Sequence, residues 1–263
     1  MKQLNWKKRI GCAALILGML AMMVCNLNQM QVFASNVKNE ATTKKTTKSK
    51  KKKKNGIVVV IDPGHQQKGN PEKEPNGPGS KTMKAKVSSG ATGKWTKLPE
   101  YKLNLQVSLK LKKELEKRGY TVYMTRKTHD VDMSNKERAE FATKKKADIF
   151  VRIHANGSDN ASVSGALCVA PSKKNQYVKK IATKCQSLSQ AVVDAYCKET
   201  KLKNRGLMIS DTMSGINWCT MPVTIVEMGY MSNKSDDTKM ANKKFQKKMV
   251  TGIANGIDNY FKK

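Results

Sequence analysis

Hydrophobic and polar positions in residues 56–263 follow two alternating patterns, one typical of strands and one typical of helices. The run "IVVVI" at positions 57–61 is continuously apolar, as expected for a strand that is covered on both faces. Later, a leucine or valine recurs every fourth residue and predicts a helix that Gly119 stops; these residues are Leu103, Val107, Leu111 and Leu115.

The same two patterns continue to the end of the chain. Further strands are predicted at "YTVYMT" (120–125), "ADIFVRIH" (147–154), "GALCVA" (165–170) and "PVTIVEMGY" (222–230). Further helices are predicted from Ser134, where Glu137 completes a capping box, from Tyr177 to about Thr200, and from Lys239 to Phe261. This order predicts one α/β domain, with a mostly parallel but mixed, twisted sheet flanked by helices on both faces. Because only a short loop precedes "GALCVA", we expect this strand to pair antiparallel with "ADIFVRIH" at an edge of the sheet.

Residues 67–99 interrupt this alternation. They are rich in Gly, Pro, Ser and Lys and contain few large apolar side chains, which predicts a long surface loop. Loops of this length are often functional, and this one is long enough to cover a site.

The N-terminal residues have the composition of an export signal followed by a linker. Residues 1–34 combine early lysines and an arginine, an uncharged apolar run from Ile10 to Cys25 and the small-residue site Val32-Phe33-Ala34, as in a signal peptide. The apolar run of 16 residues is shorter than the roughly 20 that a membrane span needs, so an uncleaved anchor is the less favoured alternative. Residues 35–55 are polar and lysine-rich and predict a disordered polybasic linker, which leaves 56–263 as the folded domain of a secreted protein.

The net charge of +31 requires a polyanionic neighbour or a strongly solvated surface. Residues 1–55 contain 13 basic residues and one acid, and residues 56–263 still carry +19. For an exported chain the available polyanions are wall polymers and acidic lipids, so we expect anionic wall polymers to bind the polybasic linker and we expect no nucleic acid partner. A merely solvated lysine-rich surface is the alternative, and a monomer is expected.

Four cysteines remain after removal of the predicted signal peptide. Because they belong to an exported chain, disulfides are permitted, and sequence alone leaves the pairing open. Two of them lie 12 residues apart in one predicted helix, roughly 18 Å along its axis, which is too far for them to bridge each other. The default prediction is that they are small buried side chains: Cys168, Cys185, Cys197 and Cys219.

Three predicted strands end in side chains that can bind a metal or transfer a proton. His65 follows the first strand after Asp-Pro-Gly, His154 ends "ADIFVRIH", and Glu227 ends "PVTIVE". Ligands of open α/β sheets bind beyond the carboxyl ends of the strands, so these side chains are expected to meet. A catalytic zinc needs a third protein ligand, and Glu100 is the candidate because it opens the first helix, although a first-turn glutamate that only complements the helix dipole explains it equally well. The remaining histidine, His129, is predicted to lie on the surface.

These segments resemble the zinc-dependent N-acetylmuramoyl-L-alanine amidases that hydrolyse peptidoglycan. The resemblance rests on five segments in order: "VVVIDPGH" (58–65), "PEYKLNL" (99–105), "RGYTVYMTR" (118–126), "ADIFVRIHAN" (147–156) and "MPVTIVEMGYMSN" (221–233). It implies that residues 56–263 form a zinc amidase catalytic domain with one Zn²⁺ held by His65, Glu100 and His154. It also implies that Glu227 is the catalytic glutamate and that the bond cut joins N-acetylmuramic acid to L-alanine.

Some finer expectations accompany this resemblance. Asn156 is a weak candidate for substrate binding. Gln66 and Gln67 stand where family members commonly have glycines, which predicts a narrower or more polar pocket. Two rival functions stay open, namely a zinc peptidase that cuts within the stem peptide and a non-catalytic basic wall-binding module.

Overall fold

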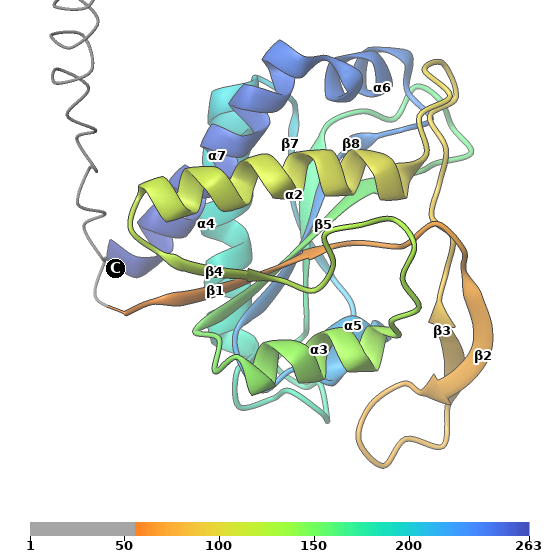
Figure 1. The fold of residues 1–263 in the computed structure, drawn as a ribbon, viewed down its shortest axis with the longest axis vertical. Helices are drawn as coiled ribbons and strands as arrows, with labels where there is room; N and C mark the ends of the chain where they lie inside the picture. Colours follow the sequence, from red (N-terminus) through yellow and green to blue (C-terminus); the bar gives the residue numbers. More distant parts are fainter. Residues whose placement is uncertain (1–55, 263) are drawn as a thin grey trace, which may run out of the picture. The chain divides into compact units, whose positions relative to one another are not determined.

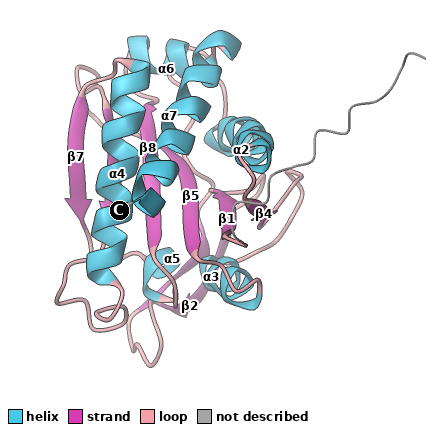
Figure 2. Cartoon of the chain, turned by 90° about the vertical axis from the view of Figure 1, so that its left-hand side faces the viewer, coloured by secondary structure: helices cyan, strands magenta, loops and turns pink. Residues whose placement is uncertain are grey.

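A computed structural model describes residues 56–262, and the predicted signal peptide and polybasic linker lie outside the described residues. A six-stranded sheet forms the centre of this region, with the strand order β4-β1-β5-β8-β6-β7. Figures 1 and 2 show helices on both of its faces. The strands of the sheet are β1 (Val58–Pro63), β4 (Thr121–Met124), β5 (Ile149–Asn156), β6 (Ala166–Ala170), β7 (Asn204–Ile209) and β8 (Val223–Tyr230).

Two apolar cores lie on opposite faces of this sheet because alternate side chains of each strand point in opposite directions. In β1, for example, Val59 and Ile61 belong to one core and Val60 to the other. The first core is closed by the helices α2 (Glu100–Lys117), α4 (Ala182–Thr200) and α7 (Lys243–Lys262). The second is closed mainly by α3 (Asn135–Lys144) and the short α5 (Ser214–Asn217). The predicted α/β domain with a mixed, mostly parallel sheet is confirmed.

Local sequence signals explain how two of the predicted helices begin and end. At α3 the Ser134 side chain accepts a hydrogen bond from the Glu137 backbone N–H, and the Glu137 carboxylate accepts one from the Ser134 N–H, as the capping box predicted. Helix α2 ends at Lys117, and the following Gly119 adopts a positive φ of 95°.

The pairing predicted for "GALCVA" is wrong. This strand, β6, pairs antiparallel with β8 and parallel with β7, and it lies inside the sheet. Both edges of β5 are already occupied, by β1 and β8, so β6 extends the sheet from β8. The edge strand β7 was missed because most of its side chains are exposed and its apolar run is only three residues long, Leu207 to Ile209.

The predicted loop at 67–99 contains a two-stranded antiparallel hairpin, β2 (Asn70–Pro75) and β3 (Met83–Val87). Little of the hairpin is buried and its strands are mostly polar, so the pattern of hydrophobic residues did not predict them. In Figure 1 this hairpin projects away from the main sheet, on the side reached by the carboxyl end of β1.

Two helix predictions need new boundaries. The segment from Tyr177 is not helical until α4 begins at Ala182, because the Asn175 side chain accepts hydrogen bonds from the backbone N–H groups of Tyr177 and Val178 and holds a turn. The closing helix is two helices, α6 (Lys234–Ala241) and α7, separated at Asn242. Asn242 is extended and its side chain accepts from the first N–H groups of α7, so it works as a helix cap.

The four cysteines of the described region are free and buried, which agrees with the default prediction. Within residues 56–262 no helix combines the length and the hydrophobicity required to cross a bilayer.

Candidate metal centre

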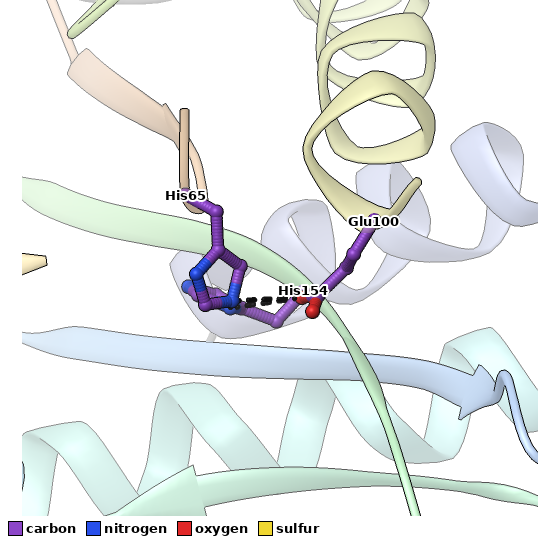
Figure 3. Close-up of side chains that lie close together, drawn as sticks. All are labelled: His65, Glu100 and His154. Atoms are coloured by element: carbon purple, nitrogen blue, oxygen red, sulfur yellow. Dashed lines mark hydrogen bonds and ion pairs between the residues drawn. The ribbon is translucent and has the colours of Figure 1, made fainter. Parts of the chain in front are cut away.

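Three different elements bring His65, Glu100 and His154 together at the carboxyl end of the sheet. His65 follows β1, His154 lies near the end of β5, and Glu100 is the first residue of α2. Strands β1 and β5 are neighbours and run parallel, so both imidazoles lie at the carboxyl end of the sheet. Figure 3 shows the two imidazoles and the carboxylate pointing toward one another.

The three donor atoms form a nearly equilateral triangle. His65 Nε2 lies 3.1 Å from Glu100 Oε1 and 3.2 Å from His154 Nδ1, and the latter two atoms are 3.3 Å apart. Ligands at a typical Zn–N or Zn–O distance of about 2.0–2.1 Å and tetrahedral angles are separated by roughly 3.3–3.4 Å. The triangle therefore has the dimensions of one face of a tetrahedral zinc site.

The state of the two histidines agrees with a role as ligands. His65 Nδ1 is 2.9 Å from the backbone oxygen of Ser88, which can only accept, so Nδ1 carries the proton and Nε2 directs its lone pair at the triangle. Burial lowers the pKa of His154 to about 4, so this imidazole is neutral at pH 7.

Glu100 is held as a carboxylate in one orientation. Its Oε1 accepts from the Asn104 side chain at 3.1 Å and from the Ala155 backbone N–H at 3.1 Å, and its Oε2 accepts from the Ala91 N–H at 2.8 Å. Burial alone would raise the pKa of Glu100, but its close contacts with His154 and His65 lower it below its usual range. The helix-dipole explanation of Glu100 is therefore insufficient, since its carboxylate points at both imidazoles.

This donor set fits a divalent cation. Two neutral imidazole nitrogens and one carboxylate oxygen direct their electron pairs at a common point, which is unfavourable unless a positive charge lies there. Among the residues that the structure describes, these three side chains form a group whose donor atoms lie close enough together to hold one metal ion. Two nitrogens and one oxygen are characteristic of a catalytic zinc site that keeps a fourth position for water or substrate.

Gly90 makes room for this cluster from the loop before α2. Its φ of +81° is a conformation that L side chains rarely adopt. A Cβ at this position would lie 2.8 Å from Glu100 Oε2 and 2.9 Å from the His65 ring. Only glycine therefore lets the loop pass so close to two of the three donors.

Glu227 lines the same cavity as the two histidines. It lies on β8 opposite His154 of β5, and the cavity has a volume of about 350 Å³. Burial, with a smaller effect of the nearby Glu100 carboxylate, raises the pKa of Glu227 to about 8. Among residues 56–262 its carboxyl group forms no hydrogen bond or ion pair, which leaves it available to a bound molecule.

A buried ion-pair network fixes the turn that carries His65. Asp62 accepts from Arg138 at 2.7 Å and from Arg152 at 2.8 Å. Arg138 also donates to the backbone oxygens of Pro63 and His65. Burial opposes ionisation of Asp62, but the two guanidinium groups hold the pKa of Asp62 far below its usual range.

Arg152 was missed at the sequence level although it lines the cavity. Its signal was available, because it is a charged residue inside the apolar strand "IFVRI", two positions before His154 and thus on the same face. Strand β3 of the hairpin and the residue after it supply another wall, so part of the predicted loop does border the site: Lys84, Ala85, Val87 and Ser88.

Three other predicted positions lie away from the cavity. Asn156 does not line it, and its side-chain oxygen accepts from the Gly157 N–H. Gln66 is buried and bonded to Arg138, so it neither narrows the pocket nor makes it more polar. His129 is half-buried and packs edge-on against Tyr101, with ring centroids 5.3 Å apart.

Comparisons with known proteins agree on one family. Residues 59–259 match the model of the N-acetylmuramoyl-L-alanine amidase family. YqiI of Bacillus subtilis (strain 168), described as uncharacterized, is 32% identical over 174 residues, which are 66% of this chain and 79% of YqiI. The N-acetylmuramoyl-L-alanine amidase LytC of the same strain is 25% identical over 174 residues, 66% of this chain but 33% of LytC.

The fold also has a solved counterpart. The N-acetylmuramyl-L-alanine amidase Ami1 from Mycobacterium smegmatis superposes with a TM-score of 0.71 at 22% identity, covering 79% of this chain and 97% of Ami1. At this identity the likeness concerns the arrangement of the sheet and helices.

Proposed function

The chain belongs to the N-acetylmuramoyl-L-alanine amidase family, and on that basis we propose that it is a zinc-dependent amidase that hydrolyses peptidoglycan. The bond cut is the amide between the lactyl group of N-acetylmuramic acid and the L-alanine of the stem peptide. The observation that carries the proposal is the convergence of donor atoms from His65, Glu100 and His154, beside a cavity that the two histidines and Glu227 line.

Each site residue has a distinct task. His65, Glu100 and His154 hold the zinc ion, which when bound acidifies water and polarises an amide carbonyl. In its ionised form, Glu227 takes a proton from the attacking water and passes it to the nitrogen of the departing L-alanine. Water adds to the carbonyl carbon, the C–N bond breaks, and the products are a free lactyl carboxylate and a free amine.

The protein acts outside the membrane, where its substrate lies. The signal-peptide pattern of residues 1–34 supports export, and the lysine-rich residues 35–55 support electrostatic attachment to anionic wall polymers. Asn156 remains a candidate for contacts with longer substrates, beyond the cavity itself.

The test is a digestion of purified peptidoglycan by the wild type and by Glu227→Gln, with mass spectrometry of the products. The wild type is expected to release stem peptides with a free N-terminal L-alanine and to leave unsubstituted muramic acid. Glu227→Gln keeps its zinc, measured by elemental analysis, but loses turnover by at least 100-fold, the lower end of typical general acid–base contributions.

The rivals predict other products. Cleavage within the stem peptide would identify a peptidase with the same metal chemistry. Equal wall clearance by wild type and Glu227→Gln, unaffected by a chelator, would identify a non-catalytic binding module.

A further inference from the structure

Arg152 lies beside the metal centre, and one nitrogen of its guanidinium group forms no hydrogen bond among the described residues. It precedes His154 by two residues on β5, so both side chains project from the same face of the sheet. The residue is 3% exposed, yet it lines the cavity together with His154 and Glu227. The established family chemistry described above assigns it no task.

Two hydrogen bonds fix the plane of this guanidinium. Its Nε donates to Asp62 Oδ2 at 2.8 Å and its Nη2 donates to Asn135 Oδ1 at 2.7 Å. Its Nη1 forms no hydrogen bond with any residue in 56–262, and this atom is not fully buried. Nη1 is therefore a positioned donor that is accessible from the cavity.

Gly215 is the neighbour that gives Nη1 its space. A Cβ on Gly215, which lines the same cavity, would lie 1.4 Å from Arg152 Nη1. Any larger residue would have to displace the guanidinium. The close approach is thus a built feature of the cavity wall.

No carboxylate of residues 56–262 forms a hydrogen bond or ion pair with Nη1, although Glu227 of the same cavity interacts electrostatically with Arg152 without direct contact. Asp62 is one carboxylate shared between the buried guanidinium groups of Arg138 and Arg152. Lys84 adds a further positive charge to the lining and forms no ion pair within the described region. A buried cation without a full counter-charge is unfavourable, so this end of the cavity favours an anion.

The spacing suits a carboxylate close to the scissile bond. Two residues along a strand correspond to about 6.6–6.8 Å, and an extended peptide advances at most about 3.3–3.6 Å per residue. For a substrate that extends from a scissile carbonyl at the His154 end toward Arg152, this spacing brings the residue after L-alanine near Arg152.

From these observations we propose that Arg152 Nη1 binds the α-carboxylate of the stem-peptide residue after L-alanine, and that the protein consequently prefers the free acid to the α-amide. The inference rests on the proposed function for the identity of the substrate. The guanidinium group donates a charge-assisted N–H···O hydrogen bond to a carboxylate, whereas its hydrogen bond to a neutral carboxamide is weaker.

The experiment compares N-acetylmuramoyl-L-alanyl-D-glutamate with N-acetylmuramoyl-L-alanyl-D-isoglutamine, which differ at that α-carboxyl group. The wild type is expected to hydrolyse the acid with a kcat/KM roughly tenfold or more above that of the amide, mostly through KM. Arg152→Gln is expected to reduce this ratio to about one, and Arg152→Lys to restore part of it. Gly215→Ala keeps the charge but displaces Nη1, so it is expected to reduce the ratio as well.

A binding measurement separates this inference from the proposed function. Calorimetric titration of both compounds into Glu227→Gln is expected to show the same acid preference, and adding Arg152→Gln to that protein is expected to remove it. If the wild type hydrolyses neither compound but the binding preference is present, the proposed function fails and the carboxylate site stands. If Arg152→Gln loses hydrolysis of acid and amide by the same factor, or if wild type and Glu227→Gln show no preference, the carboxylate site is refuted. If Arg152→Gln does not unfold cooperatively and is therefore misfolded, the acid-to-amide preference of Gly215→Ala decides whether Arg152 binds the carboxylate.

Discussion

Asp62→Asn tests the buried network that supports the site. The substitution keeps the size of the side chain but removes the negative charge between Arg138 and Arg152, whose side chains are 0% and 4% exposed. Removing one partner of a buried ion pair typically costs about 3–5 kcal/mol, because it leaves an uncompensated buried charge. Here two guanidinium groups lose their shared carboxylate, so the upper part of that range is expected.

The assay is urea and thermal unfolding of wild type and variant at pH 7. A domain of 150–250 residues loses about 2–4 °C in Tm per kcal/mol, so a loss of about 4–5 kcal/mol in Asp62→Asn is expected to lower Tm by about 8–20 °C. Glu140→Gln is the control because it breaks the exposed i,i+4 pair of Lys136 and Glu140, and pairs of this kind contribute about 0.3–0.5 kcal/mol.

The pH dependence gives a second, independent readout. Because the pKa of Asp62 is lowered in the folded state, its contribution is complete above the unfolded pKa of about 4 and is lost as pH falls toward the folded value. The difference in unfolding free energy between wild type and Asp62→Asn should therefore shrink between about pH 4 and pH 2. A variant as stable as the wild type at pH 7, or a difference that grows in acid, would show that Asp62 is not the counter-charge of this network.

Three further outcomes test the metal centre and the core. Gly90→Ala is expected to weaken zinc binding by roughly 10–100-fold in a competition titration, as displaced supporting groups do, whereas Gly79→Ala, with a similar positive φ but no atom within 4 Å of its added Cβ, should leave it unchanged. Equal zinc affinity in the two variants would contradict the close packing at Gly90. A chelator is expected to lower Tm and abolish hydrolysis, with zinc restoring both, since a ligand at 100 times its Kd stabilises the folded state by about 2.7 kcal/mol; an unchanged Tm would argue against a metal there. Burial raises the pKa of the four thiols in the described region, which belong to Cys168, Cys185, Cys197 and Cys219. A thiol reagent should therefore modify them only after unfolding, and rapid labelling of the native protein would contradict their burial.

Much of the fold was predictable because strong local signals coincide with buried elements. The apolar runs of β1, β5 and β8 are strands with both faces covered, and a strand of this kind has no polar side to confuse the pattern. The capping box at Ser134 and the glycine after α2 likewise act within one turn of chain. The prediction that His65, His154 and Glu227 share one edge followed from the geometry of parallel strands.

The errors arose where a long-range contact or a single polar side chain decides the structure. The partner of β6 depends on which strand edges the rest of the sheet leaves free, and this cannot be read from a loop length. The exposed strands β2, β3 and β7 have little apolar pattern to detect. At Asn242, one side chain that caps α7 ends an otherwise continuous helical pattern.

The sequence by itself determined the order of elements, the two histidines at strand ends and the residues that can bind a metal, because these depend on local periodicity and on the chemistry of single side chains. Only the tertiary structure decided that the Glu100 carboxylate faces both imidazoles and that Gln66 turns away from the cavity. It also decided that Arg152 keeps one nitrogen free beside Gly215. The physical reason is that orientation and hydrogen-bond partners depend on groups 17 to 90 residues away in the chain, which local patterns do not encode.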